Sequence, residues 1–301
     1  MGRTHEHDEE GAEGPRLFVT MTLNFIITVA EIVGGLVSGS LALLSDALHN
    51  FSDGISMVIS YIAIRLKLRP NTYRHTFGLK RAEVFAAVIN SSALLAITIF
   101  LFIEAANRFA HPEPIRGMVM LIVASVGLAA NVIGSVLLHR GSKNSMNIKA
   151  AYLHLFTDAI SSVGVILGGI AISLWHIYWI DPVLTILIGL YIIKEVFEIL
   201  KVTVHTLMEG VPGNLSVQEI GAAIEATPGV LGVHHVHLWS VGENDTHFEA
   251  HVVTDDKPLS NADDIRTKTA RMLSERFDIN HATLQMECGS CPDSGLIKER
   301  R

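Results

Sequence analysis

Hydrophobic positions along this chain gather in long runs. Residues 84–103 and 117–138 contain no ionisable side chain. Each run is long enough to cross a hydrocarbon core of roughly 30 Å as a helix. Four further apolar stretches carry only a few ionisable groups and cover residues 17–39, 41–64, 150–175 and 182–204. The pattern predicts six membrane-spanning helices in contact with lipid, with both ends of the chain on the same side.

Positive charge indicates which side that is. The connection 65–81 carries six Lys or Arg residues and the connection 139–149 carries three, whereas the opposite connections carry only Arg108 and Arg116. Cytoplasmic connections of membrane proteins are enriched in Lys and Arg. We therefore expect a multi-pass protein of the cell inner membrane with both termini in the cytoplasm.

The composition changes from about Glu209 onward. Residues 209–301 contain 15 acidic and 8 basic side chains, so this part carries the whole formal charge of −7. Such an acidic domain is a poor nucleic-acid binder and a plausible cation binder. We expect a disordered tail at 1–15, a membrane domain at 16–208 and a cytoplasmic domain at 209–301.

The cytoplasmic part has the pattern of a small α+β domain. Its order is helix, strand, strand, helix, strand, with Ser216 and Ser260 as candidate helix caps. The expected strands are 230–241, 246–254 and 279–288. Strand alternation places Phe248, Ala250 and Val252 on an apolar face toward the helices. The opposite face carries histidine and carboxylate side chains.

One motif occurs twice inside the apolar spans. The segment Ala47–Ser56 (ALHNFSDGIS) and the segment Tyr152–Ser161 (YLHLFTDAIS) are identical at six of ten positions. Both contain His-x-x-x-Asp, which places the two side chains on one face of a helix. The second and fifth spans run in opposite directions and can face each other. A four-ligand site is therefore predicted from His49, Asp53, His154 and Asp158.

The chemistry of this set suits a divalent cation. Two ionised Asp and two neutral His offer a charge of −2, and imidazole with carboxylate in a tetrahedral array favours Zn²⁺ or Co²⁺. Ionisable groups within a bilayer are costly unless they are paired or functional. Metal binding requires deprotonated ligands, so binding releases protons and protonation releases metal. The alternative is that these polar groups only join helices by hydrogen bonds.

At these residues the chain resembles the cation diffusion facilitator family of zinc and cobalt transporters. The resemblance covers nearly the whole chain, including Gly39–Asp53, Phe77–Glu83, Asp181-Pro182 and Val233–Trp239. It implies a homodimer that exports zinc in exchange for protons by alternating access around a tetrahedral site. It also implies a ferredoxin-like, metallochaperone-like cytoplasmic domain. The His-Asp/His-Asp composition resembles the zinc-preferring members.

The resemblance also implies a cytoplasmic zinc site. It carries over His234, His251, His281 and Glu287 as ligands, with His235 and His237 as competitors for the first position. Because His234 shares strand parity with Val236 and Leu238, we expect it where its strand begins. A further pair of thiols, Cys288 and Cys291, could bind metal, and the tail residues His5 and His7 could join them as ligands.

Other functions are less consistent with the sequence. An intramembrane metalloenzyme needs an open ligand position and a general base, and all four candidates are committed to metal. A metal sensor would not need six spans around a midplane site. No Gly-rich nucleotide motif occurs, so ATP-driven pumping is not expected. Glu31 lies in a span without an obvious partner, and two roles stay open for it: a proton acceptor lining the cavity, or a group that hydrogen-bonds between helices. Arg81 and Glu209, both at the cytoplasmic boundary, are expected to pair.

Overall fold

The computed structural model describes residues 22, 24–139, 146–242, 245–289 and 295–297. Contacts divide the chain into two compact units. The first unit consists of the chain up to Val58 together with Ile89–Glu198, and the second of Ile59–Val88 together with Ile199 to the end.

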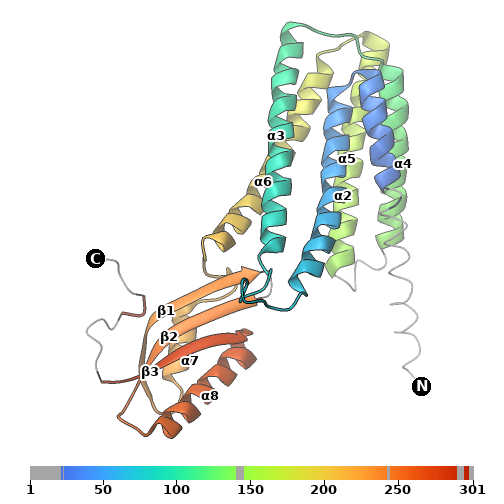
Figure 1. Cartoon of the computed structure of the whole chain (residues 1–301). Coiled ribbons are helices and arrows are strands. Elements are labelled where there is room, and N and C mark those ends of the chain that lie inside the picture. Colours follow the sequence, from blue (N-terminus) through green and yellow to red (C-terminus); the bar gives the residue numbers. More distant parts are fainter. Residues whose placement is uncertain (1–21, 23, 140–145, 243–244, 290–294, 298–301) are drawn as a thin grey trace, which may run out of the picture. The chain divides into compact units, whose positions relative to one another are not determined.

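Long helices build the first unit, and three of them continue into the second (Figure 1). A helix at Asn24–Ser38 is followed by five longer ones. These are α2 (Leu41–Lys67), α3 (Ala82–Ala110), α4 (Gly117–His139), α5 (Met146–Trp175) and α6 (Ile180–Leu207). Their order agrees with the six predicted spans, and the predicted fold class is confirmed.

The surface of these helices is apolar. Large side chains such as Phe100, Val136 and Leu167 are more than half exposed. A water-soluble bundle would hide most of this surface, whereas lipid tails accept it. By length and composition, α3, α4 and residues Ala151–Trp175 of α5 qualify as membrane spans among the described residues. Helices α2 and α6 carry more charged groups, and those of α2 include two of the predicted ligands.

Small residues let α4 and α5 pack closely. A Cβ atom added to Gly117 would lie 2.9 Å from the carbonyl oxygen of Gly169, and one added to Gly169 would lie 3.2 Å from the amide of Leu121. Only glycine permits backbones to approach so closely, as at many helix contacts in membranes. Buried apolar side chains of α2, α4 and α5, including Leu43, Met120 and Val165, fill the space beside this contact.

The start of α2 is held by a carboxylate from α6. Asp181 is fully buried and accepts hydrogen bonds from the Ser40 hydroxyl at 2.5 Å and from the amides of Leu41 at 2.8 Å and Ala42 at 3.2 Å. The first amides of a helix have no partner within the helix, and a negative charge there is favourable. This contact positions α2, which carries one His-x-x-x-Asp motif.

The second unit contains a three-stranded sheet. Helix α7 (Val217–Glu225) precedes β1 (Val230–Gly242) and β2 (Asp245–Thr254), and α8 (Leu259–Phe277) precedes β3 (His281–Cys288). The strand order is β1-β2-β3, with β1 antiparallel and β3 parallel to β2. Phe248, Ala250 and Val252 are buried in the core with side chains of α7 and α8, which confirms the predicted alternation.

Of the two predicted helix caps, one is confirmed. The Ser216 hydroxyl accepts a hydrogen bond from the Glu219 amide at 3.3 Å at the start of α7. The prediction for Ser260 was wrong, because this residue lies inside α8 and the capping position is Pro258, which has no side-chain oxygen. Proline before the first turn fixes the chain direction instead of capping an amide.

A bulge in β1 changes which side chains share a face. The pairing with β2 shifts register between His234 and His237, and His235 has a positive φ of 52°. An extra residue in one strand reverses the alternation beyond it. Val233 and Val236 therefore both enter the core, while His234 lies on the opposite face. His234 is thus in the middle of β1, and the expectation that it marks the start of the strand was wrong.

Candidate functional site

The two His-x-x-x-Asp motifs come together between α2 and α5. Nε2 of His154 lies 3.3 Å from Oδ2 of Asp53 and 3.4 Å from Oδ2 of Asp158, and Nε2 of His49 lies 3.7 Å from Oδ2 of Asp53. The donor atoms of His49, Asp53 and His154 all lie within 4.8 Å of one another. Asp158 adjoins this group through His154.

These distances resemble those between ligands of one metal ion. Two atoms bound tetrahedrally to zinc at about 2.0–2.1 Å lie roughly 3.3 Å from each other. Nε2 of His154 and Oδ2 of Asp53 and Asp158 have no hydrogen-bond partner among the described residues, although these atoms are buried. Buried polar atoms normally have partners. A divalent cation among them would satisfy all of these atoms at once.

Two residues of α6 lie next to this group, and no pattern in the sequence was a reason to assign them to it. Oε2 of Glu195 lies 3.7 Å from Nε2 of His49, and the Tyr191 hydroxyl donates a hydrogen bond of 2.9 Å to Oε1 of Glu195. The sequence showed Glu195 only as a charge in an apolar span. Its spacing of four residues from Tyr191 places both side chains on one face of the helix, but it does not show which other helix that face contacts.

Two further buried carboxyl groups lie near the motif. Glu31 is 1 % exposed and accepts a hydrogen bond of 3.3 Å from the side-chain amide of Asn50. It therefore has a partner that the sequence did not reveal. Asp46 is 3 % exposed and accepts a hydrogen bond of 2.7 Å from the Ser161 hydroxyl. Asp46 lies three residues before His49, and Ser161 lies three residues after Asp158.

The second unit holds a second group of possible ligands on the open face of its sheet. Glu287 of β3 places Oε2 at 3.4 Å from Nε2 of His234 and Oε1 at 2.8 Å from Nδ1 of His251. Their donor atoms lie within 4.8 Å of one another. His234 is 4 % exposed, and its Nε2 has no hydrogen-bond partner among the described residues. Two imidazoles and one carboxylate fit zinc and leave a tetrahedral position for another donor.

His281 does not join this group. Parallel pairing places His281 beside His247 and Gln285 beside His251. Four residues of extended strand span roughly 13 Å. The His281 ring instead lies 4.2 Å from the His247 ring between centroids, with Phe77 covering the His247 ring at 5.3 Å. Burial, and then the charges of His281 and Lys80, lower the pKa of His247.

Other predicted ligands are less defined. Cys288 is exposed and ends β3. His5, His7 and Cys291 lie outside the described residues. His237 is exposed, and its ring lies 5.1 Å from that of His235, whose own ring lies 4.7 Å from that of His251. Both competitors therefore adjoin the three-residue group without belonging to it.

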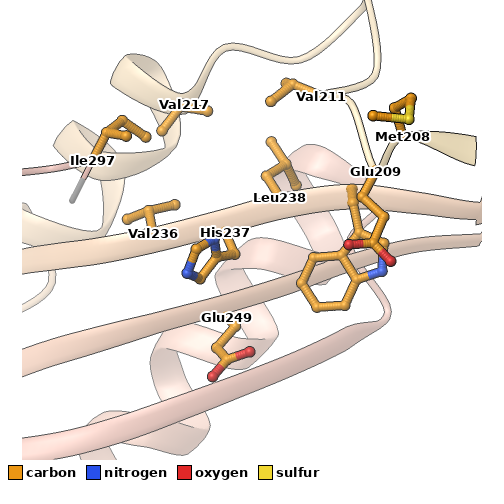
Figure 2. Close-up of a pocket in the computed structure, with 10 residues that line it drawn as sticks. Met208, Glu209, Val211, Val217, Val236, His237, Leu238, Glu249 and Ile297 are labelled. Carbon is orange, nitrogen blue, oxygen red and sulfur yellow. The ribbon is translucent and has the colours of Figure 1, made fainter. Parts of the chain in front are cut away.

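A pocket of about 490 Å³ lies elsewhere in the second unit. Figure 2 shows its apolar lining from β1, α7 and the segment between α6 and α7, with polar groups contributed by Glu209, His237 and Glu249. None of the three candidate zinc ligands lines this pocket.

Ion pairs join the end of α2 and the loop before α3 to the sheet and to Glu209, which follows α6, all within the second unit. The predicted pair of Arg81 with Glu209 is confirmed, with 3.1 Å between Nη2 and Oε1. Nζ of Lys80 donates a hydrogen bond of 2.7 Å to Asp245, and Nζ of Lys67 lies 3.7 Å from the same carboxylate. Partial burial alone would raise the pKa of Asp245, but the hydrogen bond and both lysine charges outweigh it, so this pKa lies below its usual value.

Comparison with known protein families accounts for nearly the whole chain. Residues 17–208 match the cation efflux transmembrane domain, and residues 212–288 match the cytoplasmic domain of cation efflux proteins. The chain belongs to the cation efflux family. It is accordingly an integral membrane transporter and not an enzyme.

Curated relatives of the cation efflux family align over almost their full length. The zinc transporter ZitB of Pectobacterium atrosepticum is 39 % identical over 97 % of this chain and 91 % of its own length. The metal cation efflux system protein CzcD of Cupriavidus metallidurans is 35 % identical over 97 % of this chain and 92 % of its own. The cadmium, cobalt and zinc/H(+)-K(+) antiporter of Bacillus subtilis is 36 % identical over 95 % and 92 %.

A solved structure of the metal-bound C-terminal domain of the CzcD transporter is also similar. It is 32 % identical, with 24 % of this chain and 99 % of that domain aligned, at a TM-score of 0.23.

Proposed function

We propose that this chain exports zinc from the cytoplasm in exchange for protons, by alternating access around a tetrahedral site of His49, Asp53, His154 and Asp158. The observation that carries the proposal is the convergence of two imidazoles and two carboxylates from α2 and α5 at distances of 3.3–3.7 Å. The names of the relatives, which include zinc transporters and a metal/H(+)-K(+) antiporter, agree with it.

The donor set explains the preference for zinc. Imidazole nitrogen and carboxylate oxygen in a four-coordinate arrangement suit Zn²⁺, with Co²⁺ as a close equivalent, whereas Cu(I) favours thiolate and thioether ligands. Ionised Asp53 and Asp158 supply a charge of −2 that balances the cation. Two charges of opposite sign are far less costly together within a bilayer than either is alone.

The same donors couple zinc to protons. Zinc binds neutral imidazole and ionised carboxylate, so its arrival from the cytoplasm displaces protons from His49, His154 or the two aspartates. Protons arriving from the other side compete for the same lone pairs and release zinc there. Histidine changes charge near neutral pH, which makes this competition effective at physiological proton concentrations.

We further propose that the cytoplasmic domain, residues 209–301, senses zinc and joins two protomers. Its support is the group of His234, His251 and Glu287 on the open sheet face, together with the net charge of −7 on this domain. Zinc that binds the closed dimer more tightly shifts the equilibrium toward it by the difference in affinity. The membrane domain, residues 16–208, would lie in the inner membrane with both termini in the cytoplasm, as the loop charges suggest.

Reconstituted protein tests the exchange. Purified full-length protein in liposomes, with the membrane potential clamped at zero, should accumulate zinc against its gradient when a pH gradient is imposed. Collapsing the pH gradient should abolish accumulation and leave only downhill exchange. Zinc accumulation that does not respond to the pH gradient would refute proton exchange.

A further inference from the structure

The buried carboxyl group of Glu31 takes no part in the four-residue site. Glu31 lies on the helix Asn24–Ser38 and is 1 % exposed. Its Oε2 accepts a hydrogen bond of 3.3 Å from the Asn50 amide, and its Oε1 has no hydrogen-bond partner among the described residues. A Cβ atom on Gly127 of α4 would clash with Oε1, so the carboxyl group fills the space left by this glycine.

The surroundings of Glu31 are acidic and hold no compensating cation. The carboxyl groups of Asp46 on α2 and Asp158 on α5 act electrostatically on Glu31, and α4 carries no titratable side chain before its last residue, His139. Neither Glu31 nor Asp46 forms an ion pair with Lys or Arg within the described part of the chain. Asp46 in turn has His49 and Asp158 as further titratable neighbours, and Ser161 donates a hydrogen bond to it.

Electrostatics therefore favours a proton on Glu31 when no metal is bound. An ionised carboxylate buried without a cation is costly, and further carboxylates nearby increase the cost. Hydrogen bonding agrees, because Oδ1 of Asn50 and Oε1 of Glu31 are both buried acceptors without a donor. A proton on Glu31 would supply a donor to this cluster.

Metal binding would change that balance. Burial and the charge of Asp46 contribute most to the cost of ionising Glu31, and a zinc ion bound at Asp158 would cancel the further contribution of that carboxylate. In the zinc-free state, the repulsion between the Asp158 and Glu31 carboxylates is relieved only if a proton binds in place of the zinc ion. Zinc and the Glu31 proton are thus expected to exclude each other through the field, without sharing a ligand atom.

We propose that Glu31 binds one of the exchanged protons, at a site separate from the metal ligands. The inference rests on the proposed zinc/proton exchange and names one carrier of the proton. When zinc enters from the cytoplasm, the Glu31 carboxylic acid dissociates to carboxylate and its proton leaves to that side. When zinc departs on the other side, a proton from there rebinds. Asn50 holds the ionised form through its hydrogen bond.

The test is the zinc gradient at which transport stops. At zero membrane potential, net flux vanishes when the zinc ratio equals the proton ratio raised to the number of protons exchanged per zinc. Removing one exchanged proton lowers this zero-flux zinc ratio about tenfold for a gradient of one pH unit. The ratio does not depend on the transport rate, so a merely structural role for Glu31 would leave it unchanged.

Glu31→Gln in liposomes should shift the zero-flux ratio about tenfold relative to wild type. Glu198→Gln, the same substitution at an exposed position of α6, should leave the ratio unchanged. An unchanged ratio in Glu31→Gln would overturn the inference and leave the proposed function standing. A wild-type ratio that ignores the pH gradient would refute the proposed function itself.

A binding measurement covers the case in which Glu31→Gln does not transport. Full-length protein in nanodiscs is titrated with zinc while released protons are counted. Wild type should release about one proton per zinc more than Glu31→Gln, because the metal ligands are the same in both. Equal proton release would overturn the inference.

Discussion

Zinc binding to the cytoplasmic domain gives a prediction whose magnitude can be worked out. His234 is almost fully buried, and its Nε2 faces Glu287 at 3.4 Å without a hydrogen bond. Replacing His234 with Ala removes one of three donors and leaves His251 and Glu287. We expect zinc to stabilise the wild-type domain strongly and the His234→Ala domain weakly.

The size of the effect follows from linkage. A ligand at 100 times its Kd stabilises the folded state by about 2.7 kcal/mol. For a domain of this length, 1 kcal/mol shifts Tm by roughly 4–8 °C, so zinc should raise the wild-type Tm by about 10–20 °C. The core of the domain is formed by its own helices and sheet, which favours folding of residues 209–301 in isolation.

The assay is thermal unfolding of residues 209–301 with zinc or with a chelator. Two histidine variants serve as matched controls. His281→Ala should retain the zinc-dependent shift, because His281 pairs with His247 instead of the three-residue group. His237→Ala should also retain it, because this side chain is exposed and outside the group. Equal zinc stabilisation of wild type and His234→Ala, or a loss specific to His281→Ala, would refute the assignment.

Three further predictions concern selectivity and the contacts of the loop before α3. His49→Asp exchanges a nitrogen ligand for oxygen, so cadmium should compete better with zinc in transport assays; unchanged competition would contradict the role of imidazole in selectivity. Asp245→Asn should destabilise the full-length protein by about 1 kcal/mol at pH 7. Because the native pKa of Asp245 is lowered, the difference in thermal stability should persist above about pH 4 and vanish as the pH falls further; a difference that grows toward acid pH would be inconsistent. Arg81→Glu should impair zinc transport and Glu209→Arg should partly restore it in the double variant, whereas an additive loss would show that their pairing is unimportant.

Much of the architecture could be predicted from the sequence because its signals are local. Membrane spans show as apolar runs, and the strand alternation around Phe248 identifies the core face directly. His49 with Asp53 and His154 with Asp158 are separated by one helical turn, so each pair shares a helix face wherever the helix packs. The repeat then indicated that the two pairs meet.

The features that sequence reasoning missed depend on contacts between distant segments. Glu195 lies beside the candidate metal ligands because α6 packs with this side chain toward His49. The bulge at His235 reverses the alternation of β1, and no pattern of apolar positions announces one extra residue. His281 was carried over with the family motif, whereas the register of β3 against β2 places His281 beside His247, and Glu287, two residues beyond the partner of His251, reaches His251 with its side chain.

Zinc flux through Asp158→Ala tests the central claim most directly. Asp158 is 3 % exposed, and its carboxylate lies 3.4 Å from His154. Inverted vesicles containing equal amounts of wild-type, Asp158→Ala or Asp278→Ala protein are given a pH gradient, and zinc uptake is followed. Asp158→Ala is expected to lose uptake, while Asp278→Ala, changed at the exposed end of α8, should transport like wild type. Near-wild-type uptake by folded Asp158→Ala protein would contradict the assignment of the transport site.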